Sequence, residues 1–206
     1  AVSQIIPTDR TNRSAKVAQG KTTRSKKPVK TTFTPASGEF RGVWISFQDI
    51  GEKRYTKKQF ENFINKTFDN CKKNGFNAVI VHVRPFADAL YPSSYFPWSR
   101  YVSGKAGKHP GFDPLSYAVS AAHKRGLAFH AWINPYRIAS NTTNVYKLPK
   151  KSIARKWAVS KKASKRRNVL KWDGKLYFNP ASKDVQNLVC NGVREIVRDY
   201  AVDGIH

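Results

Sequence analysis

The chain has 206 residues, of which 40% are hydrophobic and 13% aromatic, so it can form one or two domains with a buried core. Its formal net charge is +25, and no apolar run approaches the roughly 18 residues that a membrane-spanning helix needs. The composition therefore excludes a helical membrane protein and raises an anionic partner as a hypothesis. The chain contains no methionine and does not start with a charged segment followed by an apolar one, so we expect a processed or partial chain.

The first 38 residues form a basic segment with few large apolar side chains. They contain eight Lys and Arg residues against one acidic residue, Asp9, and they are rich in Thr and Ser. A segment of this composition cannot offset the entropy that it would lose on ordering. We therefore expect a disordered linker over residues 1–38 and a folded domain over residues 39–206.

Strand and helix patterns alternate in the first part of that domain. An apolar run at 42–47 predicts a strand, and a helix follows from Thr56, where Gln59 completes a capping-box pattern, to Asn74. A second strand is predicted at 77–84. The next helix has a capping Asp113 with proline at its first position and closes before Gly126.

The alternation continues in the second part. A third strand is predicted at 127–134, a helix begins at Ser182, and a last strand is expected at 202–206. Between the third strand and that helix, residues 146–171 carry eleven basic residues and no acidic one. We expect an exposed, poorly packed loop there, which could be a solvated segment or a surface that adheres to an anionic polymer.

The two cysteines, Cys71 and Cys190, fit neither a metal-ligand spacing nor a disulfide framework. Each falls on the apolar stripe of a predicted helix. We expect buried free thiols, and the sequence predicts no metal ion and no other cofactor.

Helices between strands predict an α/β fold with a parallel sheet, and side-chain parity favours a (β/α)₈ barrel over an open sheet. In each of the first three strands one face is aliphatic, while the other becomes polar or aromatic toward the carboxyl end, where a barrel places its active site. No glycine-rich phosphate loop follows the first strand, which weakens the open-sheet alternative. We predict the first half of such a barrel.

Aromatic and planar hydrogen-bonding groups near the strand ends suit a polyhydroxylated ligand. Parity places Arg84 and Asn134 on the inner face, and we expect them to converge with Asp88 in a shared cleft. Several of these groups could instead have a structural role. Trp44 and Trp132 could fill the barrel, and His82 and His130 could be histidines of the core. Arg84 and Asp88 could pair to brace the loop.

Four motifs occur in order along the domain: RPFADALYPSSYFPWSRYVSG at 84–104, HAWINPYR at 130–137, YFNPASKDVQ at 177–186 and DYAVDGIH at 199–206. Together they closely resemble the glycosyl-hydrolase-like barrel family of bacterial envelopes, some of whose members cleave peptidoglycan glycan strands that lack stem peptides. The resemblance covers about residues 38–206, the amino-terminal half of the family. It implies a TIM-type barrel, secretion or lipid anchoring, and glycosidase chemistry. The residues that we expect on the substrate side are Arg84, Asp88, Trp132, Asn134, Tyr136, Arg137, Asn179 and His206.

In the family, the strand that reads VDGIH here continues into an aspartate-rich turn, whereas this chain ends at His206. Glycoside hydrolysis requires two carboxyl groups across the scissile bond. The inward strand positions supply none, Asp49 and Asp88 fall in loops, and Asp203 is expected to be structural. We therefore expect the catalytic carboxylates beyond His206 and a chain that is inactive alone.

The sequence leads to a fragment of a secreted or envelope glycoside hydrolase whose partner is a cell-wall glycan, with an anionic wall polymer as a possible second partner of its basic segments. The rival hypothesis is a basic carbohydrate- or polyanion-binding protein without catalysis. Binding of nucleic acid through residues 146–171 is a third hypothesis, but no nucleic-acid motif accompanies the charge, so we expect no such partner.

Overall fold

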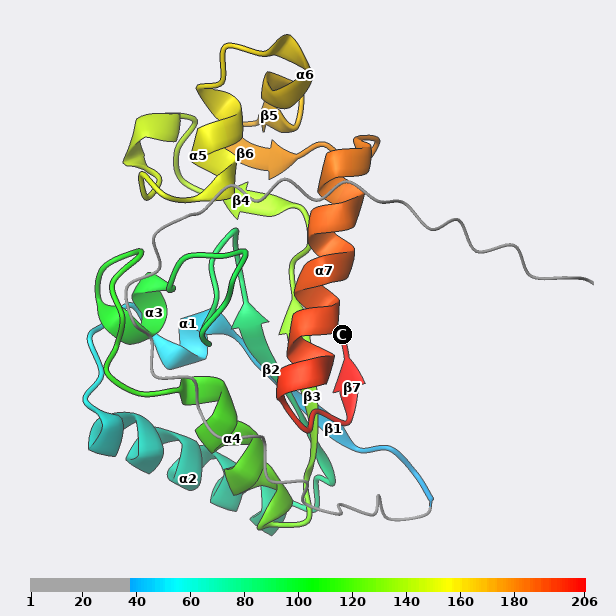
Figure 1. Ribbon diagram of the computed structural model, residues 1–206. Helices are drawn as coiled ribbons and strands as arrows, with labels where there is room; N and C mark the ends of the chain where they lie inside the picture. Colours follow the sequence, from blue (N-terminus) through cyan, green and yellow to red (C-terminus); the bar gives the residue numbers. More distant parts are fainter. Residues whose placement is uncertain (1–37) are drawn as a thin grey trace, which may run out of the picture.

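A computed structural model describes residues 38–206 of the chain (Figure 1). The predicted linker over residues 1–38 lies outside this range except for Gly38. In chain order the elements are β1 (Gly42–Ile45), α1 (Phe47–Ile50), α2 (Lys57–Lys73), β2 (Ala78–Arg84), α3 (Arg100–Ser103), α4 (Pro114–His123), β3 (Ala128–Ile133), β4 (Arg137–Ala139), the 3₁₀ helix η1 (Val145–Lys147), α5 (Ile153–Ala158), α6 (Ala163–Arg166), β5 (Val169–Trp172), β6 (Lys175–Phe178), α7 (Lys183–Asp199) and β7 (Gly204–Ile205).

The main sheet contains β1, β2, β3 and β7 in that spatial order, and every neighbouring pair is parallel. The strands keep their chain order, as in a (β/α)₈ barrel, whereas a doubly wound sheet reverses it at a switch point. The α/β fold class, the parallel sheet and the partial barrel are confirmed.

Helices α2 and α4 begin as their capping patterns predict. Thr56 and Gln59 form the capping box of α2, and Asp113 caps α4 by accepting a hydrogen bond from the Ser116 amide at 3.1 Å. Helices α2 and α4 lie side by side against one face of the sheet (Figure 1). The buried side chains of α2 are Phe60, Ile64, Phe68 and Cys71.

The two cysteines differ in burial. Cys71 is buried as expected, but Cys190 is exposed, so that part of the prediction is wrong. The buried stripe of α7 passes through Val185, Leu188, Gly192 and Ile196. Cys190 comes two residues after Leu188, about 200° around the helix, and it therefore faces solvent.

The two faces of the sheet differ in chemistry as parity predicts. Val79, Val81 and Phe129 belong to the hydrophobic core beneath the helices. His82 and Trp132 lie on the opposite, inner face, where their rings stack on each other. Asp203 is structural, as expected: its Oδ2 accepts a hydrogen bond from the Phe129 amide at 2.7 Å and lies 2.8 Å from His123 Nε2.

A β-bulge changes the direction of the last residue of β2. His82 pairs with Trp132, but Arg84 pairs with Ile133, so β2 contains one extra residue at this point. The shift turns Arg84 away from the inner face and toward α7, where its Nη1 lies against Gly192. The predicted inner-face position of Arg84 is therefore wrong, because parity assumes an unbroken strand.

Residues 134–182, between β3 and α7, form an insertion that contains a second, antiparallel sheet in the order β4-β6-β5. The prediction of a poorly packed loop over residues 146–171 is therefore wrong. This segment contains helices, buries Ala154, and packs the Trp157 ring 5.8 Å from that of Phe178. The prediction that its charges are exposed holds for nine of the eleven basic residues, while Arg155 and Lys165 are half-buried.

The contact between α7 and Arg84 can be tested with Gly192→Ala. A Cβ at this position would lie 2.5 Å from Arg84 Nη1 and 2.9 Å from a ring carbon of Phe96. We expect a loss of about 1–3 kcal/mol in the free energy of unfolding, measured by urea denaturation, because overpacking opposes the better helix propensity of alanine. Asn187→Ala, at an exposed position of α7, should be neutral or slightly stabilising. Equal effects of the two substitutions would contradict close packing at Gly192.

Candidate functional site

Four aromatic side chains, three from β1, β2 and β3 and one that directly follows β7, meet on the inner face of the sheet. We call Trp44, His82, Trp132 and His206 the inner-face cluster. The His82 and Trp132 rings are parallel within 7°, with their centroids 3.7 Å apart. Trp44 Nε1–H donates a hydrogen bond to His206 Nε2 at 3.1 Å, and the His206 ring lies 6.1 Å from that of Trp132. The cluster extends toward the carboxyl ends of the strands, where barrel enzymes place their sites.

Burial divides the cluster into a supporting part and an accessible part. His82 is only 1% exposed, whereas Trp44 is 56% exposed and His206 is also exposed. Burial, with smaller contributions from the neighbouring Arg137 and His206, lowers the pKa of His82 to about 3. His82 is therefore a neutral ring at pH 7 that supports the half-buried Trp132.

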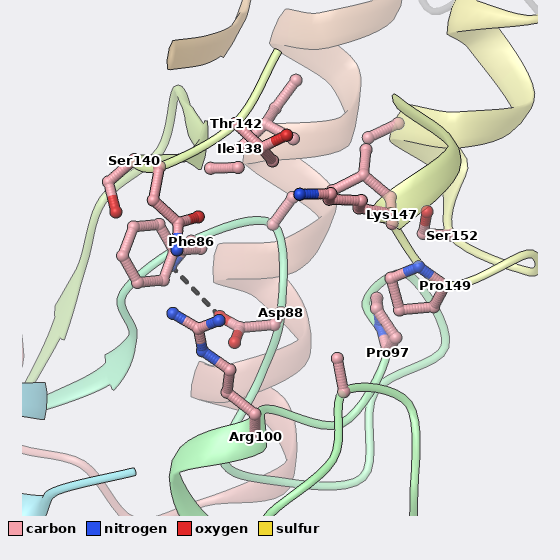
Figure 2. A pocket seen from close by; sticks show the side chains of 16 residues that line it. Phe86, Asp88, Pro97, Arg100, Ile138, Ser140, Thr142, Lys147, Pro149 and Ser152 are labelled. Atoms are coloured by element: carbon pink, nitrogen blue, oxygen red, sulfur yellow. Dashed lines mark hydrogen bonds between the residues drawn. The ribbon is translucent and has the colours of Figure 1, made fainter. Parts of the chain in front are cut away.

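A separate cavity of about 200 Å³ lies between the loop that follows β2 and the insertion. Figure 2 shows Asp88 and Arg100 on one wall and Lys147 on the opposite wall. The remaining wall is largely apolar and includes Phe86, Ile138 and Leu148. The cavity thus combines an apolar surface with one carboxyl group and two basic groups.

Asp88 is 9% exposed, and its Oδ1 accepts a hydrogen bond from the Phe86 amide at 3.1 Å. Burial raises the pKa of Asp88 to about 6, although the Ser99 hydroxyl, the Phe86 amide, Arg100 and Arg84 act in the opposite direction. Asp88 is therefore partly protonated near neutral pH and can donate or accept a hydrogen bond.

Arg84 does not reach either region as an accessible group. It is fully buried, and its guanidinium lies 4.3 Å from the centroid of the Phe96 ring. Burial lowers the pKa of Arg84, while Tyr91, Asp88 and Glu195 offset part of that effect. Arg84 thus joins the loop after β2 to α7, and the shared cleft expected for Arg84, Asp88 and Asn134 does not form.

The other predicted site residues do not lie in one cleft. Trp132 and His206 belong to the inner-face cluster, and Arg137 acts on it through its charge. Asn134 Nδ2 donates to the Pro85 carbonyl at 2.9 Å and thereby ties the end of β3 to that of β2. Tyr136 is 38% exposed beside Arg137.

Asn179 lies in the turn before α7. Its Nδ2 donates to the Arg167 carbonyl, and its Oδ1 accepts from the Ala181 amide, both at 3.1 Å. The side chain thus stabilises this turn, and a role for Asn179 toward a substrate stays a prediction.

Arg100 and Lys147 were not predicted as site residues. Each lies in an irregular or short helical segment, and only the folded insertion brings Lys147 opposite Asp88. The sequence indicates that Trp44 and His82 are aromatic side chains on the inner face of their strands. Side-chain parity alone does not show whether such a residue binds a ligand or fills the barrel. Asp49 belongs to the capping box of α1, in which Ser46 is the N-cap and the Asp49 Oδ2 accepts a hydrogen bond from the Ser46 amide at 2.7 Å.

Among residues 38–206, no three His, Cys, Asp or Glu side chains gather closely enough to hold a metal ion. Within the same range, no helix has the length and apolar character required to cross a membrane.

Residues 39–206 match the model of the family described as glycosyl hydrolase-like 10. The chain belongs to this family. It is 40% identical over 176 residues to the glycosyl hydrolase YngK of Bacillus subtilis, covering 82% of this chain and 32% of YngK. It is 30% identical over 190 residues to the glycosyl hydrolase DigH of Escherichia coli K12, covering 87% of this chain and 43% of DigH. The chain therefore spans less than half the length of these relatives.

The fold is similar to that of the maltogenic alpha-amylase AmyB of Thermotoga neapolitana, with a TM-score of 0.50. The alignment covers 81% of this chain and 38% of the amylase at 15% sequence identity, so the likeness concerns the fold alone. The family assignment and the barrel-type fold that the four motifs imply are confirmed.

The raised pKa of Asp88 can be tested with Asp88→Asn, which keeps an oxygen for the Phe86 amide. Because the pKa of Asp88 rises from 3.8 to about 6 on folding, the native chain binds more protons than the unfolded chain between these values. The wild type should lose about 2–2.5 kcal/mol of stability relative to Asp88→Asn as the pH rises from 4 to 7, in urea denaturation. A difference that does not change with pH would contradict the burial of an ionisable carboxyl at this position.

Proposed function

We propose that the chain forms the glycan-binding half of a barrel that hydrolyses the glycan strands of peptidoglycan. The observation that carries the proposal is the inner-face cluster at the strand ends of a glycosyl hydrolase-like family member. The faces of Trp44 and Trp132 suit the C–H faces of pyranose rings. Under this proposal, Arg137 and Asn134, which lie at the start of β4 and just after β3, bind sugar hydroxyl groups.

The catalytic carboxyl groups are proposed to lie in the part of the barrel that the longer relatives possess and this chain does not cover. Hydrolysis needs two carboxyl groups about 5 Å apart for retention or about 6.5–9.5 Å apart for inversion. Within residues 38–206 the inner face of the strands supplies no Asp or Glu. Asp49 belongs to the capping box of α1, and Asp88 lies in the separate cavity. Under this proposal, the chain alone binds glycan without cleaving it.

The substrate implies a place of action outside the cytoplasm, in the cell envelope. A second candidate function is a basic polyanion-binding module without catalysis. The exposed basic side chains of 146–171 favour it, because they create a strongly positive surface on the insertion.

Glycan binding by the inner-face cluster can be tested with peptidoglycan from which the stem peptides have been removed. Trp132→Ala should weaken binding about tenfold in a sedimentation assay, since an aromatic contact contributes on the order of 0.5–1.5 kcal/mol beyond its buried area. Trp172→Ala removes a tryptophan that is 70% exposed on the β5–β6 hairpin and should leave binding unchanged. Circular dichroism of both variants controls for folding.

The same samples also report cleavage. We expect the wild-type chain to release no soluble fragments. Binding that survives Trp132→Ala would contradict the proposed sugar site, and release of fragments that stops in Asp88→Asn would show that a catalytic carboxyl group lies within this chain.

A further inference from the structure

A groove with a strong excess of positive charge continues from the cavity beside Asp88. It has a volume of about 430 Å³ and shares part of its lining with that cavity, including Arg100, Lys147 and Pro149. We call it the basic groove. Its charged lining consists of Glu52, Arg100, Lys105, Lys147, Lys150 and Arg155.

Two of the basic groups in the groove already have partners. Arg155 Nη1 donates to the carbonyl oxygens of Tyr146 and Leu148, both at 2.9 Å, and so holds the segment between η1 and α5. Arg100 Nε lies 3.2 Å from Glu52 Oε2. These contacts fix the walls of the groove and neutralise its one acidic group.

Three lysines remain available. Lys105, Lys147 and Lys150 form no ion pair with any of residues 38–206. They come from two segments that are distant in sequence, one after α3 and one around η1, and they line the same groove. Lysines that line one groove without an acidic partner produce a positive potential that a bound anion would neutralise.

The adjoining cavity determines which kind of anion fits. Its apolar wall of Phe86, Ile138 and Leu148 suits the C–H face of a sugar ring or a methyl group, while the lysines lie next to it. A ligand that fills both spaces therefore has an apolar or pyranose part joined directly to a negative group. A sugar that carries a carboxylate has this form.

The position of the groove connects it to the glycan. Its walls come from the segments that follow β1, β2 and β3, at the carboxyl end of the barrel strands (Figure 1). Resting on the proposed function, we infer that the basic groove is a subsite for carboxylate-bearing sugars of the glycan strand, with Lys105, Lys147 and Lys150 binding the free carboxylate. The subsite distinguishes strands with free carboxylates from strands whose carboxylates are converted to amides.

The test uses the 1–206 chain and three soluble probes in isothermal titration calorimetry: a glycan-strand fragment with free lactyl carboxylates, the same fragment with these groups amidated, and a neutral chitooligosaccharide of equal length. We expect the free-carboxylate fragment to bind at least tenfold more tightly than the other two. The Lys147→Ala/Lys150→Ala variant should lose this advantage and keep its affinity for the chitooligosaccharide.

The matched control is Lys161→Ala/Lys162→Ala, which removes the same charge from exposed positions of the insertion outside the groove. It should retain at least half of the affinity for the acidic fragment. An equal loss in both double variants would overturn the subsite in favour of nonspecific attraction. Binding of all three probes with equal affinity would overturn the subsite while leaving the proposed function intact. No binding of any probe would overturn both.

A glycerol phosphate polymer is the fourth probe. Weaker binding of the polymer than of the acidic fragment supports the carboxylate subsite. Tighter binding of the polymer, lost in Lys147→Ala/Lys150→Ala, would assign the groove to a phosphodiester ligand and overturn the inference.

Discussion

The β-bulge between His82 and Arg84 determines where Arg84 lies relative to the inner-face cluster and the cavity beside Asp88. Regular alternation directs His82 to the inner face of the sheet, whereas the bulge directs Arg84 into the core under α7. Arg84 then anchors the loop after β2 through Phe96, and this loop forms one wall of the cavity that contains Asp88. Because an extra residue reverses the side-chain direction in a strand, a regular β2 would bring the guanidinium to the inner face and leave the loop without its buried anchor.

The inner-face cluster and the basic groove have different chemistry, and packed rings lie between them. The Phe47 ring lies 5.4 Å from that of His82 and 5.3 Å from that of Phe86, which lines the cavity. The cluster is aromatic and contains a neutral histidine, which suits uncharged sugar faces. The groove presents ammonium groups, which suit anions. A glycan with alternating neutral and acidic sugars would match both regions.

The sequence predicts the regular part of this fold well and the irregular part poorly. Capping residues such as Thr56 and Asp113, and the alternating faces of the strands, act locally, so the parallel sheet, its helices and the aromatic inner face are predictable. The bulge depends on how β2 pairs with β3, and no residue type within the apolar strand indicates it. The small sheet was missed because basic residues dominate 146–171, although Asp173-Gly174 is a typical hairpin turn. The direction of the Arg84 side chain and the position of Lys147 therefore could not be predicted from the sequence alone.

The central claim is that sugar contacts the inner-face cluster while Arg84 remains part of the core. The most direct measurement is a ¹H–¹⁵N NMR titration of the chain with denuded glycan fragments, following the five tryptophan indole signals and the Arg84 Nε–H signal. We expect the Trp44 and Trp132 signals to shift, with those of Trp157, Trp172 and Arg84 unchanged. Shifts of Arg84 together with an unchanged Trp132 would contradict the account.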